Sequence, residues 1–190
     1  MVPLKKLHQV LEQSEYPQLP KCDNVEVGSI SREEIVDRAW LAGIIDGEGT
    51  IILGNPMTGR MTVQVRVENT DPYMIQRISQ IWERHNIKFS LGFQRRPPKR
   101  DTLAINSTGY GSVKKALELV LPYLTTKYKQ AVCLLRFIDY RQSFDYNTNL
   151  KDSGIAEIAV KVREELHALR YQDHNLQRLK RVASKSLNLD

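Results

Sequence analysis

Two hydrophobic periods alternate along the chain and predict an α+β fold. Residues 32–46 place apolar side chains at helical spacing, and from Thr50 the period changes to two. A short strand pattern at 50–53 and an alternation of apolar and polar residues over 61–68 lie on either side of a turn at 55–59. This part of the chain therefore predicts one helix followed by a β-hairpin with one dry face.

The succession of helix and hairpin then occurs again. A helix beginning at Pro72 carries an apolar stripe that ends near Trp82. A second hairpin follows, with strands at 88–94 and near 103–105 joined by a turn at 95–100. The last helical patterns lie at 112–121, 126–144 and 154–171. The predicted order is α-β-β-α-β-β-α, with an antiparallel sheet and additional C-terminal helices.

Polar residues mark where the first two helices begin. Ser31 and Glu34 form a capping box, in which the Ser31 hydroxyl accepts from a free amide and the Glu34 side chain reaches back. Thr70 or Asp71 caps the next helix, with Pro72 in its first turn. These signals predict helix starts at about residues 32 and 72.

The second half of the first predicted helix has almost no polar side. Ala39, Gly43 and Gly47 fall at i, i+4 and i+8, a row of minimal side chains along which another helix could approach at backbone distance. Trp40 and Ile44 lie on a second apolar row. We therefore expect this helix to be buried on nearly all of its faces.

Two carboxylates stand at the C-terminal end of that helix, where the backbone carbonyls already carry partial negative charge. Asp46 and Glu48 have the wrong sign for the helix dipole, so a cation is expected to compensate them. Carboxylate oxygens and a main-chain carbonyl suit magnesium. The alternative is a plain helix end, in which Gly47 and Gly49 supply the turn and the acids are solvated.

Residues 41–49, Leu-Ala-Gly-Ile-Ile-Asp-Gly-Glu-Gly, resemble the nine-residue signature of the LAGLIDADG homing endonucleases. The chain departs from the signature at Ile44, Gly47 and Glu48, and Glu48 keeps a carboxylate where the family has its metal-binding acid. The resemblance covers about residues 35–142 and implies the αββαββα homing-endonuclease fold, with a saddle-shaped antiparallel sheet. The sequence holds one copy of the motif, which in this family implies a homodimer with two active sites.

A second part of the resemblance precedes the penultimate helical pattern. Lys127, Lys129 and Gln130, which follow a proline, are similar to the alternate lysines and glutamine of single-motif members. The resemblance implies that Lys127 lies in the active-site water network. It also implies a water-orienting residue near Glu68 or Asn69, which we assign to Asn69 although glutamine is frequent there in the family. The alternative for the lysines is a solvated first helical turn.

The implied reaction is hydrolysis of phosphodiester bonds across the minor groove of a long double-stranded DNA target, leaving 3′ overhangs. Glu48 from each subunit and the Gly47 carbonyl are expected to hold Mg²⁺ or Mn²⁺, which would activate water and stabilise charge on the phosphate. Lys127 and Asn69 are the other expected catalytic residues. The expected dimer-interface residues are Ala39, Gly43, Asp46 and Gly47.

Polar side chains on the wet faces of the two hairpins form a candidate DNA-binding surface. Such groups can bond base edges and phosphates, and a two-stranded ribbon fits the major groove. The basic turn at 95–100 contains two prolines and suits phosphate contacts. A solvated sheet face is the alternative. The expected DNA-binding residues are Thr50, Ile52, Thr62, Gln64, Arg66, Lys88, Ser90, Gln94, Arg95, Arg96, Lys99, Arg100 and Lys129.

The amino-acid composition excludes some classes of protein but does not by itself identify the function. The 190 residues, 41% of them hydrophobic, suffice for one domain with a core, and a formal net charge of +6 favours a polyanionic partner. Two cysteines give no disulfide framework or zinc site, and no run has the length of a membrane span or signal peptide. We expect an intracellular protein without a membrane partner, in a bacterial cytoplasm or an organelle.

The chain is expected to divide into three regions, and three functions fit the resemblance. The regions are an N-terminal extension at 1–30, an endonuclease domain at 31–172 and a basic C-terminal tail at 173–190. An RNA-splicing maturase of a group I intron and a LAGLIDADG-type regulator that binds DNA without cutting it are the alternatives to a nuclease. Because a pure binder has no need for the acid at Glu48, we expect a homodimeric, magnesium-dependent, site-specific DNA endonuclease.

Overall fold

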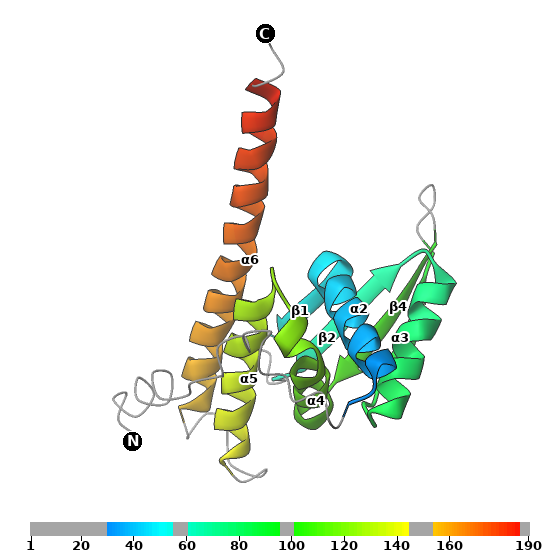
Figure 1. Ribbon diagram of the computed structural model, residues 1–190. Coiled ribbons are helices and arrows are strands. Elements are labelled where there is room, and N and C mark those ends of the chain that lie inside the picture. The colour runs from blue at the N-terminus through cyan, green and yellow to red at the C-terminus, as the bar shows by residue number, and fades with distance from the viewer. Residues whose placement is uncertain (1–29, 55–60, 96–100, 145–153, 187–190) are drawn as a thin grey trace.

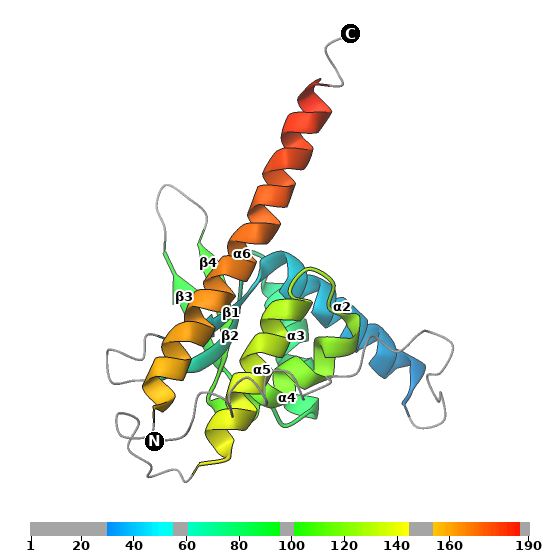
Figure 2. The same cartoon turned by 90° about the vertical axis from the view of Figure 1, so that its left-hand side faces the viewer.

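A computed structural model describes residues 30–54, 61–95, 101–144 and 154–186, with side chains described as far as Arg170. Its element order confirms the predicted α-β-β-α-β-β-α succession with further helices. Helices cover one face of a four-stranded antiparallel sheet, and in Figure 2 the strands lie to the left of most of these helices. The sheet therefore has one covered face and one open face.

Helix α2 (Arg32–Glu48) lies across the sheet in Figure 1. The Ser31 hydroxyl accepts a hydrogen bond from the Glu34 amide at 3.2 Å, as expected of its cap. The Glu34 carboxylate does not complete the expected capping box, because it pairs with Arg38 and lies 3.9 Å from His85 Nε2. The helix also runs beyond its predicted end at residue 46.

Burial divides α2 into a packed side and an exposed side. The packed side has no exposed surface at Leu41, Ala42 and Ile45, where truncation to alanine of a large side chain costs about 2–5 kcal/mol. The exposed side carries Ala39, Gly43 and Gly47. The expected burial on nearly all faces is thus wrong for the single chain, because apolar composition does not tell which face the chain itself covers.

The four strands are ordered β1-β2-β4-β3. Their bounds are β1 (Gly49–Leu53), β2 (Val63–Asn69), β3 (Ser90–Gln94) and β4 (Thr102–Thr108). Buried and half-buried residues alternate along β1 and most of β2, because successive side chains point to opposite faces. Odd-numbered residues of the sheet face the helices and even-numbered residues share the open face.

Two residues expected in the strands lie just before them. β2 begins at Val63, so Thr62 precedes it, and β3 begins at Ser90, so Lys88 precedes it. The Lys88 carbonyl accepts a hydrogen bond from the Ser107 hydroxyl at 3.0 Å, which joins the segment before β3 to β4. Both hairpins are confirmed. β2 and β3 begin two residues later than their patterns predict, whereas β1 and β4 extend beyond theirs.

The edge strand β3 departs from the expected dry face. Leu91 and Phe93 are 64% and 58% exposed, although they stand opposite Ile105 and Leu103 on the helix side of the sheet. Helix α3 (Pro72–Arg84) packs over β2 and β4 instead. Alternation of residue types predicts a strand's two faces but does not predict that the strand will lie at an uncovered edge.

Helix α3 begins as predicted, with Asp71 as its cap. Asp71 Oδ1 accepts a hydrogen bond from the Tyr73 amide at 2.9 Å. Trp82 is completely buried and meets the Phe89 ring at 6.0 Å between centroids. The other buried residues of the helix are Ile75, Ile78 and Ile81.

The remaining helices return the chain to the C-terminal end of α2 and then leave the body. They are α4 (Tyr110–Val120), the short 3-10 helix η3 (Leu121–Tyr123), α5 (Tyr128–Gln142) and α6 (Ile155–Ser186). The first half of α6 packs on α5 and β1, and Arg170 donates to the Ile51 carbonyl at 3.2 Å. Beyond this contact α6 projects away from the body in both views (Figures 1 and 2). It is one continuous helix across residue 172, where a domain boundary was expected. No helix in the described ranges is both long and apolar enough to cross a membrane.

Candidate functional site

A tight turn joins α2 to β1 and presents the acidic end of the helix. The Gly49 amide donates to the Ile45 carbonyl and closes the helix. A Cβ on Gly49 would lie 2.6 Å from that carbonyl oxygen, a distance that no side chain could tolerate without a backbone shift. Glycine is therefore required at this position by the close approach of the two backbone segments.

The other two glycines of α2 have no such reason within the chain. A Cβ added to Gly43 or Gly47 would meet no atom of the described structure within 4 Å. A glycine inside a helix costs about 0.5–1 kcal/mol relative to alanine. The described part of the chain therefore gives no packing reason for keeping these side chains minimal.

Asp46 is held by a turn from a distant part of the sequence. Its Oδ2 accepts from the Thr125 amide at 2.7 Å and from the Thr125 hydroxyl at 2.8 Å. Its Oδ1 accepts from the Lys127 amide at 2.8 Å. The Asp46 carboxylate, expected from the resemblance at a dimer interface, is thus engaged within its own chain.

The Lys127 side chain makes a second contact with Asp46. Lys127 is the N-cap residue of α5, and its Nζ donates to the Asp46 backbone carbonyl. The cation expected to compensate the end of α2 is therefore present within the chain. A positive charge there and a negative charge at the start of α5 both have the sign that the helix dipoles favour.

The surroundings of Asp46 keep its carboxylate ionised. Burial by itself would raise its pKa, but hydrogen bonds from the backbone of Thr125 and Lys127, with side-chain bonds from Thr125 and Thr126, outweigh burial and leave the pKa below the usual 3.8. At neutral pH the group acts only as an acceptor, which matches the donors around it.

Glu48, the other acid of this helix end, lacks the hydrogen-bond partners that Asp46 has. Its side chain is exposed, and among the described residues we find no hydrogen bond or ion pair to its carboxylate. The neighbouring Gly47 carbonyl lies in the last turn of α2, where carbonyls lack partners within a helix. Hard oxygen donors of both kinds are thus presented together at the helix end.

Asn69 lies at the end of β2, as expected. Because Val67 pairs with Gly49, Asn69 is at the same end of the sheet as Glu48. Its Oδ1 accepts from the Asp71 amide at 2.9 Å, so the side chain also shapes the turn into α3. The structure thus places Glu48, Lys127 and Asn69 around one end of the sheet.

The open face of the sheet is mainly polar. One row of cross-strand partners consists of Thr50, Arg66, Asn106 and Ser90. Side chains of neighbouring rows are bonded to this row: Gln64 Nε2 donates to Asn106 Oδ1 at 3.0 Å, and Glu68 pairs with Arg66. We call the even-numbered residues of β1 to β4 the open-face set.

Most of the expected DNA-binding residues belong to this set or border it. Thr50, Ile52, Gln64, Arg66, Ser90 and Gln94 belong to it, Thr62 and Lys88 precede its strands, and Arg95 follows β3. Lys129 is exposed in the first turn of α5. Arg96, Lys99 and Arg100 lie outside the described residues.

Sequence reasoning missed the part of the open face that β4 supplies. Asn106, Thr102 and Thr108 are open-face residues of that strand. The signal was present, because Thr102, Asn106 and Thr108 lie at even positions of the stretch and Leu103 and Ile105 at odd positions. Only the apolar half of that alternation was used in predicting the strand.

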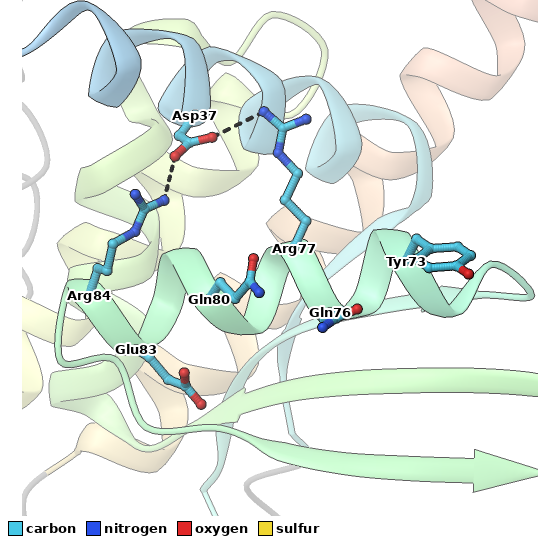
Figure 3. A pocket seen from close by; sticks show the side chains of 7 residues that line it. All are labelled: Asp37, Tyr73, Gln76, Arg77, Gln80, Glu83 and Arg84. Atoms are coloured by element: carbon cyan, nitrogen blue, oxygen red, sulfur yellow. Dashed lines mark hydrogen bonds and ion pairs between the residues drawn. The ribbon is translucent and has the colours of Figure 1, made fainter.

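A hollow on the helical side is separate from the acidic end of α2. Figure 3 shows Asp37 between Arg77 and Arg84, with Arg77 bonded to it at 3.0 Å. The other lining side chains come from α3: Tyr73, Gln76, Gln80 and Glu83. Asp37 and Glu48 are three helical turns apart on α2, about 16 Å. This cluster ties α2 to α3 and does not join the groups around Glu48.

Comparison with known proteins gives a structural answer only. No family model and no curated protein matches the chain. The homing endonuclease I-CvuI, solved with the I-CreI DNA target in the presence of magnesium, is 22% identical with a TM-score of 0.55, over 73% of this chain and 85% of that one. The same enzyme solved with its own target and calcium has a TM-score of 0.56.

An archaeal homing endonuclease has the same fold. The intron-encoded homing endonuclease I-Vdi141I, complexed with DNA, is 13% identical with a TM-score of 0.54, over 72% of this chain and 85% of that one. The chain has the homing-endonuclease fold. In this fold the protein places its acidic helix end and its polar sheet face side by side.

Proposed function

We propose that the protein is a homodimeric, site-specific DNA endonuclease of the single-motif LAGLIDADG class that uses a divalent metal ion. It cuts both strands across the minor groove of a long target and leaves 3′ overhangs. One observation carries the proposal: of the two acids at the end of α2, Asp46 is fully engaged by the chain, whereas Glu48 is exposed. The second acid is thus available to a ligand, next to a polar sheet face that can hold DNA.

The groups around Glu48 suit hydrolysis of a phosphodiester. The Glu48 carboxylate and the Gly47 carbonyl would hold Mg²⁺ or Mn²⁺, which when bound acidifies water and neutralises charge on the phosphate. The Lys127 ammonium offsets the negative charge that develops on the phosphate oxygens. Asn69 orients the attacking water from the end of β2.

A second copy of the chain would complete this site. The described residues contain no group of three or more His, Cys, Asp or Glu side chains able to share a metal ion. Two helices α2 meeting along Ala39, Gly43 and Gly47 would bring two Glu48 carboxylates together, with Asp46 beside the seam. This contact would also supply the reason for glycine that the single chain lacks.

The open-face set would read the target. Arg, Gln and Asn side chains pair with guanine and adenine edges in the major groove, and Arg66, Gln64 and Asn106 supply these types in adjacent rows. The solved complexes of I-CvuI and I-Vdi141I are DNA complexes, which supports double-stranded DNA as the partner.

A cleavage assay tests the proposal. A linear plasmid carrying the host sequence without the inserted gene would be incubated with purified protein and either magnesium or a chelator. Two defined fragments with magnesium, and none with chelator, are expected. Binding without any cut, with affinity indifferent to Glu48→Gln, would overturn the nuclease proposal in favour of a regulator. Accelerated splicing of a group I intron transcript, with no DNA cut, would instead indicate a maturase.

A further inference from the structure

We propose that Asp46 is a positioning residue, which fixes Lys127 next to Glu48 by clasping the turn that begins α5. The inference rests on the proposed function, because it assigns a role in that reaction. It concerns a residue that touches neither metal nor DNA in the mechanism above. Asp46 acts through Lys127.

The clasp has two halves that involve the same two residues. The Asp46 carboxylate accepts from the backbone amide of Lys127, and the Lys127 ammonium donates to the backbone carbonyl of Asp46. Thr125 adds an amide and a hydroxyl to the carboxylate. Lys127 is therefore held at both its backbone and its side-chain end.

This arrangement determines where the ammonium points. Lysine has a flexible four-carbon side chain and would otherwise sample many rotamers. Here its Nζ rests on the carbonyl of Asp46, one residue before Gly47 and two before Glu48. The cation is thereby kept at the helix end that presents Glu48, before any DNA binds.

The clasp depends on the negative charge of the Asp46 carboxylate. An ionised carboxylate stabilises the start of α5, where Lys127 offers no side-chain cap of its own. Asparagine at position 46 would keep the shape but would replace one acceptor with a donor that faces the amides of the turn. Asp46→Asn should therefore loosen Lys127 without removing a large side chain.

The experiment compares Asp46→Asn with Asp37→Asn. Asp37 is the matched control, because it also anchors α2, through Arg77 and Arg84 of α3, and lies away from Glu48. Cleavage of the host-sequence duplex should fall about 10-fold or more in kcat for Asp46→Asn, with KM within about 3-fold. Asp37→Asn should lose thermal stability to a similar extent and keep its kcat.

A second readout does not depend on activity. Amine-selective acetylation followed by mass spectrometry should modify Lys127 slowly and the exposed Lys129 quickly in the wild-type chain. Asp46→Asn should raise the Lys127 rate several-fold and leave Lys129 unchanged. Thr125→Val, which removes one donor and leaves the carboxylate, should give a smaller rise and serves if Asp46→Asn does not fold.

The outcomes separate the two proposals. If the wild-type protein cuts no DNA but Lys127 becomes reactive in Asp46→Asn, the nuclease proposal fails and the clasp stands. An active wild type with an unchanged kcat in Asp46→Asn overturns the positioning role. An equal loss of kcat in Asp37→Asn would overturn it as well, because general loosening of α2 would then account for both variants.

Discussion

The C-terminal end of α2 and the open face of the sheet organise their polar groups in different ways. At the helix end, a few groups are joined by charge and backbone. The Asp46 carboxylate accepts hydrogen bonds from the turn that contains Thr125, the Lys127 ammonium donates to a helix carbonyl, and Glu48 is exposed. On the open face, many side chains stand at regular spacing, and some pair with each other, as Gln64 does with Asn106 and Arg66 with Glu68.

This difference indicates a division of labour. A preorganised cluster with one unengaged acid suits a single chemical step, because little has to move when charge develops. A regular array of side chains, each able to exchange its neighbour for a base edge, suits recognition. Changes at the helix end should therefore affect the rate of cutting, and changes on the open face should affect which DNA is bound.

The largest effect is expected from Glu48→Gln. The variant keeps nearly the same volume and loses the metal-binding charge, so cleavage should fall by a factor of about 1,000 or more while DNA affinity stays within about 3-fold. Cleavage would be followed on the host-sequence plasmid and affinity by gel shift in calcium.

Glu33→Gln is the matched control, because it removes one exposed acid from the first turn of the same helix. It should cut at the wild-type rate. A Glu48→Gln protein that still cuts at a comparable rate would remove Glu48 from the metal site and end the division of labour described above.

Gly43→Leu should have the next largest effect, by separating the two proposed active sites. Within the described chain a Cβ added at this exposed position meets nothing within 4 Å, so the monomer should fold with wild-type circular dichroism. Across a two-fold seam the same side chain is inserted twice, and overpacking of this kind costs about 1–3 kcal/mol per site. Sedimentation should show a monomer, and double-strand cutting should be lost.

Ala168→Leu controls for added surface hydrophobicity, since Ala168 is exposed on α6. It should leave both association and cutting unchanged. A fully active dimer of Gly43→Leu would place the interface elsewhere and leave the glycines of α2 without an explanation.

The helix end was easier to predict from the sequence than the open face. Residues 41–49 form one contiguous stretch, so a short pattern was enough to find Glu48. The partner of Asp46 could not be predicted in this way, because Thr125 and Lys127 reach it only through the packing of η3 against α2. A compensating cation was expected at this helix end, and the Lys127 ammonium provides one, whereas a metal ion at Glu48 stays a prediction.

The open face required strand register, which the sequence specifies only indirectly. Alternation correctly assigned Gln64 and Arg66 to the wet side. It did not bring in Asn106, because that requires knowing that β4 lies next to β2. It also predicted a dry side for Leu91 and Phe93, whose exposure follows from the edge position of β3.

A moderate effect is expected from Arg66→Ala on the open face. The variant should lose about 1–3 kcal/mol of discrimination at one or two base pairs of the target, because arginine reads guanine through two hydrogen bonds. Once bound to a permissive site it should cut at the wild-type rate. Binding to a set of singly substituted duplexes would measure the change, with Arg163→Ala on the exposed surface of α6 as control. A uniform loss at every target position would mean that Arg66 contacts phosphate and does not read bases.

The smallest effect concerns acid stability and compares the two carboxylates directly. Hydrogen bonds from the turn hold the folded-state pKa of Asp46 below 3.8, so its stabilising contribution is complete above the unfolded-state pKa and is lost as the pH falls through the folded-state value. Asp46→Asn should cost about 1 kcal/mol at pH 7, as loss of a helix cap does, which lowers the melting temperature by roughly 2–4 °C. This difference should stay constant from about pH 7 to pH 5 and shrink below about pH 4, where the wild-type carboxylate takes up a proton. Glu48→Gln, measured in parallel at pH 7, controls for the loss of a carboxylate from this helix end, because Glu48 is exposed and has no hydrogen-bond or ion-pair partner among the described residues. A gap for Asp46→Asn that persists undiminished to pH 2.5 would show that shape, and not ionisation, holds the turn.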